Sequence, residues 1–244
     1  MPERAAERRP ADIRQGLLSR LFTLFAQGFK WLVLSLMFSI LTEWVGMAFW
    51  WPDQGVTHSR DMLTKELGFL GADFSQSLMT DNPERFAIMI ASQAHHGLFE
   101  VTRIDEAIQW ARAPLAPQKS RIASRLHTLL HPLSEHALAA MQITQVFAVR
   151  LGILVLALPL FAMFALIAIV DGLVQRDLRR WGGGRESSFV YHWAKRAALP
   201  LLVLTWVVYL ALPFSLHPSL VILPFATLFA LSIAVTASRF KKYL

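Results

Sequence analysis

The sequence predicts an all-α integral membrane protein with four transmembrane helices and a helical domain between the first and the second. Its 244 residues are 55% hydrophobic and only 17% charged, with a mean hydropathy of +0.42. A soluble domain typically has about 45–50% apolar and about 25% charged residues, so this composition argues against a soluble enzyme. Cysteine is absent, which excludes a disulfide framework, a thiolate metal site and a cysteine nucleophile.

Four stretches are apolar and long enough to cross a bilayer, which takes about 20 residues. The spans are predicted at residues 31–51, 146–170, 197–213 and 218–237. The last two are divided by a segment with two prolines and a histidine, which suits a tight turn. The first span ends in Trp50-Trp51-Pro52 without a small-residue cleavage site, so we interpret it as an uncleaved anchor.

Basic residues are concentrated in three segments outside the spans. Residues 1–30 and 171–196 each contain six Lys or Arg and three acids, and the tail 238–244 contains three bases. The long segment 52–145 has eight basic and ten acidic residues. Because basic excess marks the cytoplasmic side, we expect both termini and the 171–196 loop inside and the 52–145 segment outside. The net charge of +7 then reflects membrane orientation, and no direct nucleic-acid binding is expected.

The outer segment is predicted to be a helical domain. Asp81-Asn82-Pro83-Glu84 is a typical helix start, with a capping residue, a proline in the first turn and an acid near the positive end of the helix dipole. From Phe86 to Ala111, apolar residues recur at spacings of three or four, which predicts a continuous helix. We expect a shorter helix over Ser59–Leu70, and another from about Pro117 that is interrupted at Pro132.

Glu43 is the strongest single-residue signal because it is the one charged residue within the first span. A charge at the centre of a membrane helix costs about 2.5–3.5 kcal/mol on insertion scales, so Glu43 should face other helices. Arg150, near the outer end of the second span, is its expected partner by sign and depth. We therefore expect both residues in intramembrane packing. The alternative is a small transporter or channel that uses Glu43 as an intramembrane acid.

The 171–196 loop is predicted to hold an amphipathic helix that continues from the second span, followed by a glycine-rich turn. Val174, Leu178 and Trp181 share one face of that helix. Contact with anionic lipid at the inner leaflet explains the basic charge of the loop but not its glycine-rich string. We therefore expect a partner-docking surface made of Arg176, Arg179, Arg180, Trp181, Gly182, Gly183, Gly184, Arg185 and Glu186.

No catalytic, cofactor-binding or metal site is predicted. The sequence has no nucleophile elbow and no HExxH helix, and its glycine-rich string lacks the Lys-Ser/Thr end of a phosphate loop. His127, His131 and Glu135 have the spacing of stacked metal ligands. Pro132, however, disfavours the regular helix that they need. The pair His95-His96 points to two different faces of its helix.

The residues around the inner loop make the sequence recognisable. The chain resembles the integrating conjugative element membrane protein family over about residues 20–240, most specifically in 171–196. The likeness is carried by Asp171–Arg180, by Gly182–His192, by Lys195-Arg196, by Leu41–Trp44 and by the Trp50–Pro52 exit.

The resemblance implies a bacterial inner-membrane protein, encoded on a mobile element beside a conjugation apparatus of the type IV secretion kind. It implies a TraD-like coupling ATPase or channel components as partners, and it supplies no catalytic residues. We therefore expect a non-enzymatic, multi-pass inner-membrane component of DNA transfer, without a cofactor, whose 52–145 domain is periplasmic and whose termini are cytoplasmic. A recipient-side exclusion or regulatory membrane protein of the same element stays open as an alternative.

Overall fold

The computed structural model is helical through the residues that it describes, which are 17–73, 80, 82–112, 121–182 and 188–240, and these contain no strand. The predicted all-α class is confirmed for that part of the chain. The elements in chain order are α1 Leu17–Phe49, α2 Val56–Asp73, α3 Pro83–His95, the π-turn η1 His96–Glu100, α4 Ile104–Arg112, α5 Arg121–Leu156, α6 Leu158–Trp181, α7 Ser188–Ala211 and α8 Pro218–Ser238.

The chain divides into two compact units, residues 1–34 and 35–244. The described part of the first unit is the beginning of α1, whose large apolar side chains Phe22, Phe25, Phe29 and Trp31 are exposed. The described part of the second unit comprises the rest of α1 and all the other helices. Every contact discussed below lies within this second unit.

Four helical stretches are long and apolar enough to cross a membrane, as the sequence predicts. They are Phe25–Phe49, Leu133–Trp181, Phe189–Ala211 and Pro218–Ser238. The turn predicted between the last two is confirmed, because α7 ends at Ala211 and α8 begins at Pro218. The side of the membrane on which each connecting segment lies remains a prediction from the charge distribution.

The second stretch is much longer than a single span. It has 49 residues, which is about 73 Å of helix at 1.5 Å per residue, against a hydrocarbon core of about 30 Å. Only Ala157 separates α5 from α6. The N–H of Phe161 donates to the carbonyl of Ala157 at 3.3 Å and so continues the helical pattern past Pro159. Part of this helical stretch must therefore extend beyond the bilayer.

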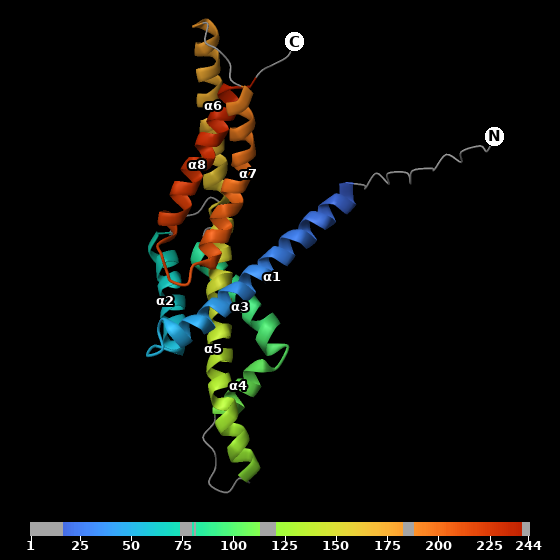
Figure 1. Cartoon of the computed structure of the whole chain (residues 1–244), viewed down its shortest axis with the longest axis vertical. Coiled ribbons are helices and arrows are strands. Elements are labelled where there is room, and N and C mark those ends of the chain that lie inside the picture. Colours follow the sequence, from blue (N-terminus) through green and yellow to red (C-terminus); the bar gives the residue numbers. More distant parts are fainter. Residues whose placement is uncertain (1–16, 74–79, 81, 113–120, 183–187, 241–244) are drawn as a thin grey trace, which may run out of the picture. The chain divides into compact units, whose positions relative to one another are not determined.

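The helices α6, α7 and α8 run side by side, with α8 against both of the others (Figure 1). Gly172 marks the closest approach of α6 to α8. A Cβ at this position would lie 2.5 Å from the carbonyl oxygen of Ala234 and 2.7 Å from the Cβ of Ala237. The backbones can pack this closely only because residue 172 has no side chain, as is common between membrane helices.

The outer segment forms a second group of helices, in which α2 and α3 pack against α5 (Figure 1). Its buried core includes Met62 of α2 with Ile143 and Val146 of α5. The helices α3 and α5 also meet at Gly152, where an added Cβ would lie in ordinary van der Waals contact with Ala87 at 3.4 Å. The helical pattern predicted for this segment is thus confirmed, while its position relative to the membrane stays a prediction.

Three details of the predicted helices are wrong. The pattern from Phe86 to Ala111 is not one helix, because α3 ends at His95 and the chain passes through η1 to Arg103, whose φ is +56°. The hydroxyl of Thr102 donates to the carbonyl of Leu98 at 2.6 Å, a local bond that competes with the helix.

The other two errors concern helix ends. The helix α5 continues through Pro132 instead of being interrupted there. One interior proline costs a helix about 3 kcal/mol, which a long, packed helix can offset. The helix α2 likewise runs past Leu70 and Gly71 to Asp73. A single glycine weakens a helix by about 1 kcal/mol without necessarily ending it.

Candidate functional site

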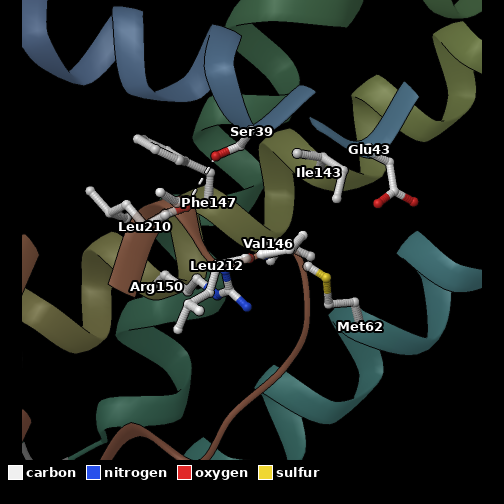
Figure 2. A pocket seen from close by; sticks show the side chains of 11 residues that line it. Ser39, Glu43, Met62, Ile143, Val146, Phe147, Arg150, Leu210 and Leu212 are labelled. Atoms are coloured by element: carbon white, nitrogen blue, oxygen red, sulfur yellow. Dashed lines mark hydrogen bonds between the residues drawn. The ribbon is translucent and has the colours of Figure 1, made fainter. Parts of the chain in front are cut away.

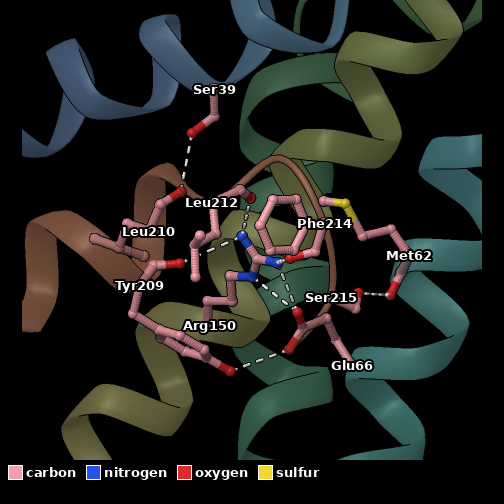
Figure 3. Close-up of polar contacts among 9 residues, drawn as sticks. All are labelled: Ser39, Met62, Glu66, Arg150, Tyr209, Leu210, Leu212, Phe214 and Ser215. Carbon is pink, nitrogen blue, oxygen red and sulfur yellow. Dashed lines mark hydrogen bonds and ion pairs between the residues drawn. The ribbon is translucent and has the colours of Figure 1, made fainter. Parts of the chain in front are cut away.

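The most ordered polar feature of the second unit is a buried cluster around Arg150 of α5. Its guanidinium donates from Nε and Nη2 to one carboxylate oxygen of Glu66, at 2.9 and 2.7 Å. The other oxygen of Glu66 accepts a hydrogen bond from the hydroxyl of Tyr209 at 3.1 Å. Arg150 is 1% exposed and Glu66 is 0% exposed, so the pair is sequestered from solvent (Figure 3).

The remaining donors of Arg150 bind the backbone at the end of α7. Nη1 donates to the carbonyls of Leu212 at 2.6 Å and Tyr209 at 3.3 Å, and Nη2 donates to that of Phe214 at 2.9 Å. The last carbonyls of a helix have no partner within the helix, and a cation there also complements the helix dipole. Arg150 therefore acts as the C-terminal cap of α7 and holds the following turn.

The cluster leaves no free donor on Arg150. The five hydrogen bonds equal the five N–H donors of a guanidinium. A transport or anion-binding site would need a donor that can exchange partners. The arrangement instead suits a fixed joint between α2, α5 and the end of α7.

Two further hydrogen bonds extend this joint. The hydroxyl of Ser39 in α1 donates to the carbonyl of Leu210 at 3.0 Å, and that of Ser215 donates to the carbonyl of Met62 at 3.2 Å (Figure 3). Polar contacts thus join α1, α2, α5 and the α7–α8 turn. We name the set Glu66, Arg150 and Tyr209 with the bound turn carbonyls the outer-end cluster.

The sequence analysis did not identify Glu66 as a site residue, although the residue pattern of α2 accounts for its position. Ser59, Met62, Glu66 and Leu70 are buried along one side of α2 at spacings of three and four. This stripe faces α5 and therefore points Glu66 at Arg150. A carboxylate between Met62 and Leu70 on one buried side of a helix was the available signal, because such a group needs a buried counter-charge.

Glu43 is buried as predicted but has a different partner. Nδ1 of His58 lies 3.1 Å from both carboxylate oxygens of Glu43. The His58 ring stacks on Trp51, with the ring centroids 4.0 Å apart. Trp51 in turn covers Gly46, where an added Cβ would lie 1.9 Å from the indole. The chain exit at Trp50–Pro52 thus folds back and encloses Glu43.

The expected ion pair between Glu43 and Arg150 is therefore wrong. Both residues line one small pocket, yet Figure 2 shows the Glu43 carboxylate apart from the guanidinium, on the other side of Val146. The pocket has a volume of about 10 Å³, which is room for about one water molecule. Glu66 competes successfully for Arg150 because α2 brings its carboxylate directly to the guanidinium, whereas Glu43 has His58 nearby.

The hydroxyls of the later spans do not line a common path. Thr205, Thr227 and Ser232 each donate to a carbonyl three or four residues earlier in their own helix. Tyr209 is committed to Glu66. Since a transporter should direct polar groups into a shared interior, these bonds give the transporter alternative no support.

The predicted docking surface lies at the other end of α6. The helix continues through Asp171 to Trp181, as predicted, and Gly182 follows as its cap, with its N–H donating to Leu178 at 3.0 Å. Val174, Leu178 and Trp181 are 51%, 67% and 92% exposed. We name these three residues with Arg176, Arg179 and Arg180 the inner-end surface.

The rest of the predicted docking set cannot be placed. Gly183, Gly184, Arg185 and Glu186 lie outside the described residues. The side chains of His127 and His131 also lie outside the described residues. The helix α5 continues through Pro132, so the predicted interruption no longer argues against the ligand spacing of these histidines with Glu135.

Comparison with known proteins identifies the family. A family described as IncC plasmid conjugative DNA transfer protein DtrJ-like matches residues 50–241, which include both the outer-end cluster and the inner-end surface. No curated protein and no solved structure matches the chain. The match confirms the broader prediction of a conjugative DNA transfer protein, while membership of the integrating conjugative element membrane protein family remains a prediction. With four helices that could cross a membrane, the chain belongs to the DtrJ-like family of conjugative DNA transfer proteins.

Proposed function

We propose that the protein is a non-enzymatic inner-membrane scaffold of the conjugation apparatus that docks the coupling ATPase, or the base of the channel, on its inner-end surface. The outer domain would contact the periplasmic parts of the apparatus. The proposed genetic carrier is an integrating conjugative element, from the resemblance described above.

One observation chiefly supports the docking role, namely the exposure of Trp181 beside basic side chains. A tryptophan that is 92% exposed at the end of a membrane helix has no packing role within the described residues. Tryptophan and arginine are enriched among the residues that dominate binding energy in protein interfaces. The adjacent Leu178 and Val174 continue the apolar strip by two turns, so the surface is large enough for a partner helix or groove.

The outer-end cluster supports the scaffold role. A buried pair with every guanidinium donor occupied holds α2, α5 and the α7–α8 turn in one arrangement. Such a joint would keep the outer domain in a fixed position relative to the bundle and would catalyse no reaction.

The first test is the conjugation frequency of a donor strain with a clean in-frame deletion of the gene, complemented from a plasmid. Transfer should collapse in the deletion strain and return on complementation. Unchanged donor transfer would contradict the scaffold proposal. The same deletion in the recipient then tests exclusion, since loss of an exclusion protein raises acceptance of incoming DNA.

The second test addresses docking directly. Trp181→Ala combined with Arg179→Glu and Arg180→Glu should reduce co-purification of the coupling ATPase from crosslinked donor membranes. Arg60→Glu is the matched control, because Arg60 is an exposed arginine of α2. Arg185→Glu extends the test to the glycine-rich turn. If the triple variant retains the ATPase but loses binding to anionic vesicles, the surface contacts lipid and the docking proposal is wrong.

A further inference from the structure

A cluster of potential metal ligands lies in the outer domain, away from both regions described above. His95 ends α3, Glu100 ends the π-turn η1 and Asp105 is in the first turn of α4. One nitrogen or oxygen from each of the three residues lies within 4.8 Å of the other two. His95 Nδ1 is 3.3 Å from a Glu100 oxygen, and His95 Nε2 is 3.6 Å from an Asp105 oxygen.

The irregular backbone is what assembles this cluster. Residues five apart on an α-helix point about 140° apart, so His95 and Glu100 would not meet on a regular helix. The N–H of Val101 donates to the carbonyl of His96 at 3.1 Å, an i to i+5 bond that widens the turn. Arg103 then adopts a positive φ of 56° and reverses the chain, which brings Asp105 back toward His95.

Two backbone irregularities within nine residues need an explanation. A π-turn inserted after an α-helix is often found at functional sites. A non-glycine residue with positive φ costs about 1–3 kcal/mol and also concentrates at functional sites. Here both irregularities serve one result, which is the meeting of three side chains that can ligate a metal.

The surroundings of the three residues resemble those of a metal site. The second oxygen of Glu100 is contacted by His96 Nδ1 at 2.6 Å, the kind of outer contact that orients a metal ligand. The second oxygen of Asp105 is buried and has no hydrogen-bond partner within the described residues, and a buried carboxylate oxygen of that kind is costly.

We propose that His95, Glu100 and Asp105 bind one divalent transition-metal ion, with Zn²⁺ as the ion that the donors fit best. Zinc takes imidazole nitrogen and carboxylate oxygen at about 2.0–2.2 Å, and sites with three protein ligands leave one position for water or another ligand. The two His95 contacts use different ring nitrogens, so an ion would bind one of them, and one ligand atom from each of the three residues lies within 4.8 Å of the other two. One imidazole with two carboxylates also suits zinc better than calcium, which prefers six or more oxygens.

The open position would face a groove. His95 and Glu100 line a groove of about 280 Å³ between α2, α3 and α5, together with Leu63, Leu67 and Ile88. The groove gives the ion an access route. The proposal is independent of docking at the inner-end surface, because it concerns a different element and has its own measurement.

The test is zinc binding by the full chain, purified in detergent with a peptide tag that lacks histidine and treated with chelator beforehand. Titration with Zn²⁺ alone should give one ion per chain for the wild type. His95→Ala and Asp105→Asn should each weaken binding by at least about tenfold. Glu106→Gln is the matched control, because it removes an exposed carboxylate from the same turn of α4 and should leave the affinity unchanged.

Folding and ion specificity are checked in the same samples. Asp105→Asn keeps the shape of the side chain, and the helical circular dichroism signal should match that of the wild type. Zinc should raise the melting temperature of the wild type and of Glu106→Gln but not of Asp105→Asn. X-ray absorption at the zinc edge should show one nitrogen from imidazole with oxygen donors. Equal affinity in wild type and all variants, or an absence of stoichiometric binding, would show that the three residues form only an ion-pair network.

Discussion

Arginines at two places along the α5–α6 stretch, near its middle and at its C-terminal end, occupy different environments. Arg150 is 1% exposed, and five hydrogen bonds bind its guanidinium. Arg179 and Arg180 lie in the last turn of α6 beside Trp181, which is 92% exposed. The buried arginine can only hold the fold together, whereas the half-buried Arg179 and the exposed Arg180 can reach a partner. The difference distinguishes an arginine that stabilises the fold from arginines that suit the recognition of a partner.

The largest expected effect comes from removing the buried cation. Arg150→Met leaves the buried Glu66 without its counter-charge and removes the donors to the carbonyls of Tyr209, Leu212 and Phe214. Breaking a buried ion pair typically costs about 3–5 kcal/mol. We expect a loss of that size in the free energy of unfolding in detergent, measured by chemical denaturation with circular dichroism detection.

The matched double variant sharpens this prediction. Arg150→Met with Glu66→Leu removes both charges, so the double variant should be more stable than Arg150→Met alone. If the losses in unfolding free energy of Arg150→Met and Glu66→Leu simply add in the double variant, the two charges do not interact as the geometry indicates. The outer-end cluster would then be an incidental contact.

The next effect concerns Glu43, whose partner differs from the predicted one. Glu43→Gln keeps an oxygen acceptor and a similar shape beside His58, so it should cost only about 1 kcal/mol. Glu43→Lys places a cation in the same buried position next to His58, which should cost several kcal/mol. The amount of folded protein in the membrane, measured by fluorescence-detected chromatography, checks the order. Wild-type amounts of the Lys variant would contradict the burial of Glu43.

Helix packing in the bundle should give a smaller effect. Gly172→Ala forces a Cβ to within 2.5 Å of the Ala234 carbonyl unless the α6 and α8 backbones separate. Overpacking of this kind costs about 1–3 kcal/mol. Gly68→Ala is the control, because a Cβ there meets nothing within 4 Å and should stabilise α2 by up to about 1 kcal/mol. Thermal unfolding in detergent distinguishes the two, and equal melting temperatures would contradict the close approach.

Sequence patterns predicted the elements better than they predicted the partners. Hydropathy predicts the number of apolar stretches, proline chemistry predicts the turn before Pro218, and amphipathic spacing predicts the continuation of α6 to Trp181. All three are local properties of the sequence. The pairing of Arg150 with Glu66 depends on how α2 lies against α5, so depth and sign alone pointed to Glu43 instead. The capping of α7 by Arg150 uses backbone carbonyls, which no side-chain pattern reveals.

The π-turn shows the same limit in the outer domain. Apolar spacing continues from Phe86 to Ala111, so periodicity predicts one helix. The hydroxyl of Thr102 and the reversal at Arg103 interrupt it through local hydrogen bonding and backbone conformation. A continuous helix keeps His95, Glu100 and Asp105 apart, so periodicity alone does not bring these three side chains together.

The smallest effect on stability is expected at the inner-end surface, and this small effect is the most informative. Trp181→Ala and Arg180→Ala remove exposed side chains, and surface substitutions usually change stability by less than about 0.5 kcal/mol. If the surface docks a partner, conjugation frequency should nevertheless fall by at least about tenfold, since interface hot spots are worth about 2 kcal/mol or more. Arg150→Met should lower both quantities together, because it acts through folding. The comparison therefore predicts that Trp181→Ala lowers conjugation frequency without lowering stability, whereas Arg150→Met lowers both. If the variants of both regions lose stability and conjugation frequency together, the inner-end surface, like the outer-end cluster, serves the fold alone.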